Sequence, residues 1–143
     1  MKKSFSLLEL ILVISLIVIL FAFLAPKYNT IFDSTNITKL KSDLAIIRSR
    51  ISKKISENVL LSKDETIVLD GAKIDTKNEK LFSNVIDFNL LSTNSDELKS
   101  GSWIKTSTST YEFIISNKKQ IAFTFTDGKL LCKSEEELCK EIQ

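Results

Sequence analysis

Few side chains in this sequence could do chemistry, and two of them are cysteines. Cys132 and Cys139 are separated by six residues, a spacing that matches no zinc or redox motif. In an oxidising compartment such a pair forms a small disulfide loop, whereas in a reducing one it remains two inert thiols. A bridged pair excludes one straight helix over residues 133–138, because two helical turns would separate the Cα atoms by about 10 Å. We expect the disulfide if this region lies outside the cytoplasm.

Glu9 is the second candidate, because it lies in an otherwise apolar run. Of the 21 residues from Phe5 to Ala25, only Ser6, Glu9 and Ser15 are polar. A charged side chain in hydrocarbon costs roughly 2.5–3.5 kcal/mol on insertion scales. Glu9 therefore needs a compensating partner or lies outside the bilayer. A plain membrane anchor, with Glu9 protonated or reaching toward water, is the simplest alternative.

Catalytic and metal-binding chemistry has little support in the composition. The chain has no histidine, which removes the commonest general base and transition-metal ligand. Its three glycines form no phosphate-binding loop pattern. The 20 Lys and Arg residues nearly balance the 18 Asp and Glu residues, so net charge does not indicate a nucleic-acid partner. We predict that the protein is not an enzyme and has no metal site and no cofactor.

The segment STNSDEL, residues 92–98, gathers oxygen atoms of the kind that Ca²⁺ prefers. Its donors do not reproduce the ordered ligand spacing of a calcium loop. We interpret the segment as a solvated loop, with a calcium site as the alternative.

The N-terminal apolar run has the length of a membrane-spanning helix. At 1.5 Å per residue its 21 residues extend about 31 Å, which is roughly the thickness of the hydrocarbon core. Lys2 and Lys3 precede it, so we expect the N-terminus in the cytoplasm and the residues after Lys27 to be exported. A cleaved secretory signal fits less well, because its apolar region usually has only about 7–15 residues.

A second helical pattern covers residues 27–63. Pro26 should kink the helix rather than end it, because apolar residues resume at helical spacing. One stripe of apolar residues recurs every three or four positions and should pack on a sheet. The stripe consists of Ile37, Leu40, Leu44, Ile47, Ile51, Ile55 and Val59. Eight Lys or Arg residues in this half indicate a solvated face, with phosphate contact as the alternative.

The remaining residues, 64–143, have the alternation and turn residues of a small antiparallel sheet. The clearest hairpin joins 111–116 to 120–126, and Asp127-Gly128 should form a further turn. We expect a strand and a turn at Asp70-Gly71 within 65–74, and a strand that begins at 103–104 before the hairpin. Residues 84–91 could form a strand or a short helical turn. The prediction is an α+β fold in which a long N-terminal helix lies across an antiparallel sheet of three to five strands.

The N-terminal sequence KKSFSLLELILVISLIVIL resembles that of type IV prepilins and type II secretion pseudopilins. In that family a short basic leader and a small residue precede a cleavage point. Phe then begins the mature chain, and Glu follows at the fifth mature position inside a long apolar helix. Phe5 and Glu9 match these two positions. The residue before the cleavage point is usually Gly in the family and is Ser4 in this chain.

The resemblance covers about the first 28 residues, since Pro26 and Tyr28 also lie where pilins commonly carry Pro and Tyr. It implies a pilin-like fold with a membrane-spanning first half of the helix. The segments it implies are a leader (1–4), a transmembrane half (5–26), an amphipathic half (27–63) and a periplasmic β-rich head with a C-terminal cysteine loop (64–143).

For the sites, the resemblance implies processing and assembly rather than catalysis. A prepilin peptidase would cut between Ser4 and Phe5 and methylate the new amine of Phe5. The Glu9 carboxylate, one helical turn from that amine, would pair with it or with that of a neighbouring subunit. Because an unpaired buried charge is penalised, such a pair would set register during assembly. Pilins also close a C-terminal surface loop with a disulfide, which here would join Cys132 to Cys139.

The function implied is that of a pseudopilin or minor pilin which polymerises through its N-terminal helix. It would serve protein secretion, DNA uptake during transformation or a surface pilus. Its partners would be other pilin or pseudopilin subunits, the prepilin peptidase, and an inner-membrane assembly platform with its ATPase, while any DNA contact would be indirect. It would span the bacterial inner membrane once, with a periplasmic C-terminal domain. The alternative is a single-pass anchored periplasmic binding module that does not polymerise.

Overall fold

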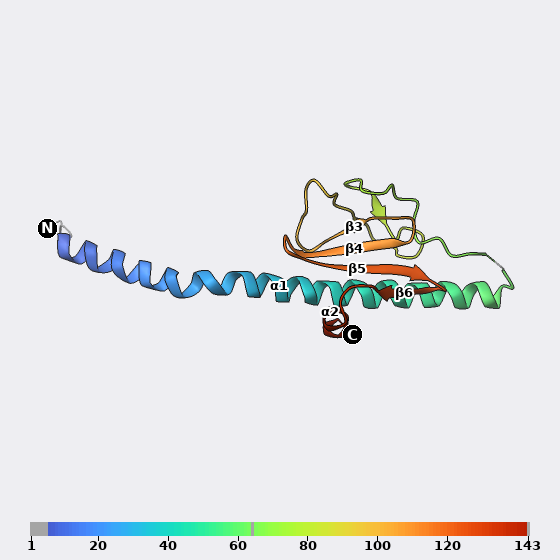
Figure 1. Ribbon diagram of the computed structural model, residues 1–143, viewed down its shortest axis with the longest axis horizontal. Coiled ribbons are helices and arrows are strands. Elements are labelled where there is room, and N and C mark those ends of the chain that lie inside the picture. Colours follow the sequence, from blue (N-terminus) through green and yellow to red (C-terminus); the bar gives the residue numbers. More distant parts are fainter. Residues whose placement is uncertain (1–5, 64, 143) are drawn as a thin grey trace. The chain divides into compact units, whose positions relative to one another are not determined.

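The part of the chain that the structure describes contains one long helix, six strands and one short helix (Figure 1). This computed structural model describes residues 6–63 and 65–142, apart from the side chains of residues 24–32. The chain divides into two compact units, Met1–Thr35 and Asn36–Gln143. The predicted α+β class, with an N-terminal helix and antiparallel sheets, is confirmed.

The N-terminal unit contains the first part of helix α1 (Leu7–Leu60). Every side chain from Ser6 to Phe23 is exposed. Between Leu7 and Phe23 only Glu9 and Ser15 are polar, so this part of the helix presents apolar side chains on all sides. It therefore differs from an ordinary surface helix, which has one apolar stripe and one polar face.

The predicted transmembrane segment, 5–26, is not confirmed. Among the residues that the structure describes, no helix is both long enough and apolar enough to cross a membrane. The predicted segment begins at Phe5, which lies outside the described residues, and it ends among the residues whose side chains are not described.

The C-terminal unit is built on a four-stranded antiparallel sheet with the order β3-β4-β5-β6. Its strands are β3 (Ser102–Lys105), β4 (Thr110–Ser116), β5 (Lys119–Thr126) and β6 (Lys129–Cys132). Two short strands, β1 (Lys80–Leu81) and β2 (Leu90–Leu91), pair separately. The predicted hairpin, the strand before it and the turn after it are all present. Helix α2 (Glu136–Glu141) follows β6.

The turn between β5 and β6 brings the sheet close to α1. Asp127 and Gly128 have φ values of 50° and 71°, which suit a tight two-residue hairpin turn. A Cβ atom on Gly128 would lie 2.7 Å from Cδ1 of Ile55. The positive φ therefore favours glycine at this position, and a larger residue would also require the Ile55 side chain to shift.

The apolar stripe of α1 packs on the sheet within the C-terminal unit, as predicted. Its buried members are Leu40, Leu44, Ile47 and Ile51, and they share one core with Trp103, Tyr111, Phe113 and Phe123. The Trp103 and Phe113 rings meet edge to face, with centroids 5.2 Å apart. The stripe does not extend as far as predicted, because Ile55 is only partly buried and Val59 is 72% exposed.

The strand predicted within 65–74 is wrong, and 84–91 is a strand only in its last two residues. The described residues of 65–74 form no strand, and Leu69 and Asp70 are both buried, which breaks the alternation of a half-buried strand. In 84–91 only Leu90–Leu91 is a strand. Phe82, with a φ of 55°, begins a turn there: its carbonyl accepts hydrogen bonds from the N–H groups of Val85 and Ile86, both at 3.0 Å.

Candidate functional site

Glu9 lies in the first turn of α1 and is exposed. Its N–H donates to the Ser6 carbonyl at 3.0 Å and lies 3.4 Å from Ser6 Oγ. Ser6 thus caps the helix, and Ser and Glu three residues apart have the spacing of a capping box. A carboxylate in a first turn also interacts favourably with the helix dipole. This local role was not predicted, although the Ser-x-x-Glu spacing was the signal for it.

The predicted processing residues, Ser4 and Phe5, lie outside the described residues. Cleavage between them, methylation of Phe5 and pairing of the new amine with Glu9 therefore stay predictions.

The predicted disulfide between Cys132 and Cys139 is present, with Cα atoms 5.8 Å apart. Strand β6 ends at Cys132, and the chain bends at Ser134 before α2 begins. Ser134 holds the bend, since its Oγ accepts from the Ala122 N–H at 2.9 Å. The segment between the cysteines is therefore not one straight helix, as the geometry of the bridge required.

The C-terminal loop is attached to the core at a second point. Ile142 is buried in the core, and Leu138 packs against the core from α2. Glu135, Glu136 and Glu137, which we call the acidic segment, are exposed. The disulfide and Ile142 together hold the acidic segment in a fixed position on the surface.

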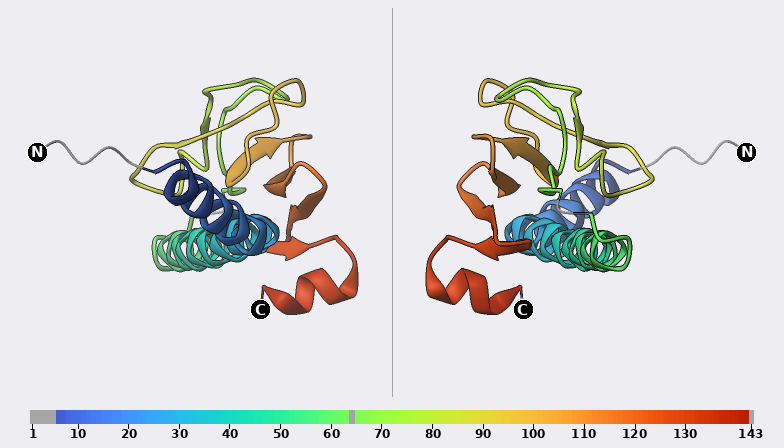
Figure 2. Two further views of the ribbon diagram at one scale, coloured as in Figure 1. Left: turned by 90° about the vertical axis from the view of Figure 1, so that its left-hand side faces the viewer. Right: turned by 90° about the vertical axis from the view of Figure 1, so that its right-hand side faces the viewer.

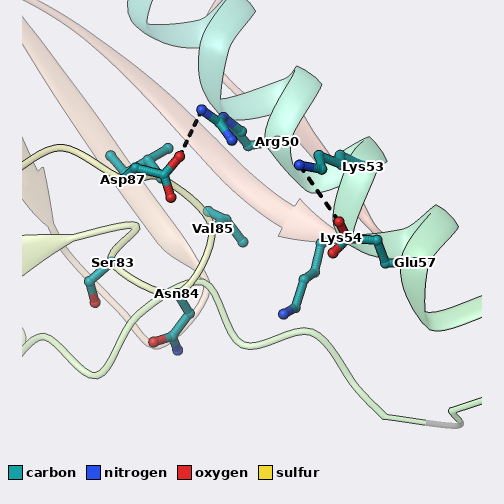
Figure 3. A pocket seen from close by; sticks show the side chains of 9 residues that line it. Arg50, Lys53, Lys54, Glu57, Ser83, Asn84, Val85 and Asp87 are labelled. Carbon is teal, nitrogen blue, oxygen red and sulfur yellow. Dashed lines mark ion pairs between the residues drawn. The ribbon is translucent and has the colours of Figure 1, made fainter. Parts of the chain in front are cut away.

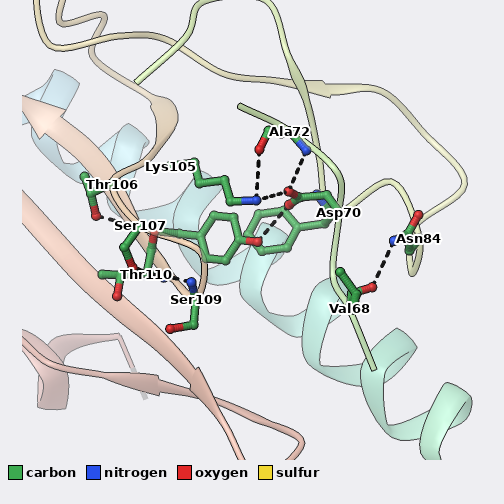
Figure 4. Close-up of polar contacts among 11 residues, drawn as sticks. Val68, Asp70, Ala72, Asn84, Lys105, Thr106, Ser107, Ser109 and Thr110 are labelled. Atoms are coloured by element: carbon green, nitrogen blue, oxygen red, sulfur yellow. Dashed lines mark hydrogen bonds and ion pairs between the residues drawn. The ribbon is translucent and has the colours of Figure 1, made fainter. Parts of the chain in front are cut away.

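A buried ion pair in the C-terminal unit was not predicted (Figure 4). Lys105 Nζ lies 2.6 Å from Asp70 Oδ1 and donates to the Ala72 carbonyl at 3.0 Å. Asp70 also accepts from the Tyr111 hydroxyl and from the Phe82 N–H, both at 2.8 Å. Asp70 and Lys105 are only 3% and 5% exposed.

This cluster is a structural element rather than a reactive site. Burial, with the Asp70 charge next, raises the pKa of the Tyr111 hydroxyl, so that it stays a hydrogen-bond donor. The bonds of Asp70 with Lys105 and Tyr111 attach it to β3 and β4. Asp70 also accepts from the N–H groups of Ala72 and Phe82, which fixes the chain on either side of it. Asp70 is consequently a buried anchor.

The donors of the loop 92–98 are largely bonded to the protein itself. Asp75 Oδ1 accepts from the Ser95 N–H at 2.7 Å, and the two hydrogen bonds from Ser95 lower the pKa of Asp75. Lys77 forms an ion pair with Glu97 and lowers the pKa of that carboxyl. Within residues 6–63 and 65–142, no group of three or more His, Cys, Asp or Glu side chains could hold a metal ion.

The basic face of α1 borders a shallow cavity of about 170 Å³ (Figure 3). Arg50, Lys53 and Lys54 line it from the helix, and the turn 83–87 lines its other side; we call this site the basic cavity. Arg50 is paired with Asp87 at 2.8 Å, and Lys53 with Glu57 at 3.7 Å. The sequence predicts a solvated basic face, with phosphate contact as the alternative, and nothing in it brings 83–87 beside α1.

The candidate residues thus lie in separate places rather than in one site. Glu9 is at the start of α1, whereas the disulfide and the basic cavity belong to the C-terminal unit. Comparisons of the chain with protein-family models, with curated proteins and with solved structures gave no match.

Proposed function

We propose that this chain is a pilin-like structural subunit, a pseudopilin or minor pilin, of a type II secretion or type IV pilus-like assembly. It acts in protein secretion or in DNA uptake during transformation. In this proposal the N-terminal part of α1 is the polymerisation element, and the C-terminal unit is the head that each subunit displays.

One observation carries the proposal: the apolar side chains of helix α1 are buried in one part of the helix and exposed in another. Residues 40–51 of α1 bury their apolar stripe against the sheet of the same chain. Residues 7–23 present apolar side chains on all sides and leave them exposed. Exposed apolar surface of this extent marks a site of contact with lipid or protein. Bilayer lipid before assembly, and the helices of other subunits afterwards, would cover it.

The N-terminal resemblance adds the processing steps to the proposal. The peptidase removes residues 1–4, and the methylated amine of Phe5 then faces a carboxylate at Glu9. Glu9 is at the first turn of α1 and is exposed, so it is accessible to the amine of a neighbouring subunit. Removing that neighbour would leave a charge without a partner in apolar surroundings, which is unfavourable.

Mass spectrometry of the protein purified from its native membrane tests the proposal. We expect a mature chain that begins at Phe5 and carries one methyl group on its amine. A Ser4→Gly variant, which restores the residue usual in the family, should be processed at least as completely. An intact leader, or cleavage at another bond, would overturn the proposal.

A second candidate function is a single-pass anchored periplasmic binding module that does not polymerise. The observation in its favour is the cap at Ser6, because it gives Glu9 a role within its own helix. In this case the protein would keep its leader and stay a single copy while the assembly machinery is active. Chemical cross-linking in intact cells separates the two candidates, since only a subunit yields a ladder of multimers.

A further inference from the structure

The basic cavity contains a positive charge that no internal ion pair uses. Arg50 and Lys53 are paired with Asp87 and Glu57, whereas Lys54 takes part in no ion pair among the described residues. Its amine points into the space beside the turn 83–87 (Figure 3). The cavity therefore has a net charge of +1, from three cations and two carboxylates. Its volume of about 170 Å³ suits a few side chains rather than a large ligand.

The acidic segment has the opposite character. Glu136 is paired with Lys140 on the same helix at 2.7 Å, whereas Glu135 and Glu137 take part in no ion pair within the described residues. All three glutamates are exposed. The disulfide and Ile142 fix the loop that carries them, so ordering it on binding would cost little conformational entropy.

The basic cavity and the acidic segment lie on opposite flanks of α1. Arg48 donates to the Leu130 carbonyl of β6 at 3.3 and 3.2 Å, so its flank of the helix faces β6. At about 100° per residue, Lys53 and Lys54 lie about 140° and about 120° around the helix axis from Arg48. Helix α2 follows β6 on the Arg48 flank (Figure 2). A chain therefore cannot bring its acidic segment into its own cavity.

We propose that the basic cavity binds the acidic segment of a second copy of this chain. The inference rests on the proposed function and names the surface by which two heads meet. Each copy uses the cavity on one flank and offers the segment on the other, so the contact is heterologous. Such a contact leaves a free cavity at one end of a pair and a free segment at the other. Repeated without closure, it builds an open fibre rather than a closed dimer.

The mixture of charges favours a protein partner over a nucleic acid. Two carboxylates, Glu57 and Asp87, line the cavity, and a phosphate backbone has no cation to offer them. The acidic segment is flanked by Lys133 and Lys140, which are both exposed. Lys133 can lie beside a carboxylate of the cavity while Glu135 or Glu137 pairs with Lys54, none of which takes part in an ion pair among the described residues. Each surface thus has the charges that the other needs.

The test uses the full chain purified in a non-ionic detergent that covers the apolar part of α1. One variant combines Lys53→Gln with Lys54→Gln and loses the cavity charges, and the other combines Glu135→Gln with Glu137→Gln. Sedimentation velocity at about 20 mM salt should reveal a series of oligomers for the unaltered chain. About 500 mM salt, which screens exposed charges, should dissolve them. Each variant alone should self-associate about tenfold more weakly.

An equal mixture of the two variants gives the sharpest result. The intact segment of one variant should bind the intact cavity of the other, and their remaining surfaces should not bind. The mixture should therefore form one-to-one pairs and no larger oligomers. A matched variant, Lys41→Gln with Lys118→Gln, removes two exposed lysines elsewhere and should associate like the unaltered chain.

Three results would overturn the inference. They are an unaltered chain that stays monomeric at low salt, variants that associate as it does, and a mixture that fails to pair. A cavity variant that loses only the binding of a labelled DNA duplex would assign the cavity to nucleic acid instead. The mass of the mature N-terminus, measured on the same preparation, tests the proposed function separately. A correctly processed chain that does not associate would remove this inference alone.

Discussion

The two parts of helix α1 place their apolar side chains in opposite surroundings. In residues 7–23 apolar side chains point in every direction and are exposed. In residues 40–51 they form one stripe, and the sheet of the same chain buries it. The second part therefore stabilises the fold of this chain, whereas the first part is available for contacts with other molecules. Substitutions in the two parts should therefore affect different measurements.

The largest expected effect on the C-terminal unit comes from Lys105→Met. It leaves the buried Asp70 carboxylate without its cation, so the free energy of unfolding should fall by about 3–5 kcal/mol. Denaturant unfolding followed by the fluorescence of Trp103 measures this, because Trp103 is the single tryptophan and is 1% exposed. Lys54→Met, at an exposed position, is the control and should change stability by less than about 0.5 kcal/mol. Equal losses in both variants would contradict the structural role of the pair.

A matched pair of leucine substitutions tests the comparison itself. Leu44→Ala, in the buried stripe, should lower the free energy of unfolding by about 2–5 kcal/mol because it leaves a cavity in the core. Leu16→Ala, in the exposed apolar part, should leave the Trp103 unfolding curve unchanged within about 0.5 kcal/mol. If Leu16→Ala destabilised the C-terminal unit as much, the two parts of α1 would not be independent.

Removing the disulfide should have a somewhat smaller effect. The double variant Cys132→Ser with Cys139→Ser should lower the free energy of unfolding by about 2–3 kcal/mol, because the closed loop is short. Hydrogen exchange should become faster in α2 and stay unchanged in residues 7–23. Detection of two free thiols in the unaltered protein by non-reducing mass analysis would show that the bridge is absent in solution.

The smallest effect should come from Ser6→Ala. Loss of the cap should destabilise the start of α1 by about 1 kcal/mol and speed amide exchange at Glu9 and Leu10. Ser15→Ala is the control, because its Oγ bonds only to the Leu12 carbonyl within the helix, at 2.9 Å. Unchanged exchange at Glu9 in the Ser6 variant would argue against the cap.

The elements that follow a regular period were predictable from the sequence. The stripe of α1, the hairpin of β4 and β5 and the turn at Asp127-Gly128 depend on residues close together in the chain. The cysteine pair was predictable for the same reason. The cap at Ser6 had a signal in the Ser-x-x-Glu spacing.

The features that were missed depend on distant residues. Asp70 pairs with Lys105, 35 positions away, so neither residue indicates the other in the sequence. The basic cavity likewise needs the turn 83–87 beside α1, and no local pattern brings the two together. Local sequence patterns predicted the elements, whereas these contacts arise only from the tertiary packing of the C-terminal unit.

The most direct test of the central claim is whether a Glu9→Ala variant enters fibres in cells that also make the unaltered chain. We expect this variant to be inserted in the membrane and cleaved before Phe5, but not to be incorporated into fibres. A Ser15→Ala variant, which removes the other described polar side chain within residues 7–23, should be incorporated normally. Normal incorporation of Glu9→Ala would contradict the claim that this carboxylate is paired with a neighbouring subunit during assembly.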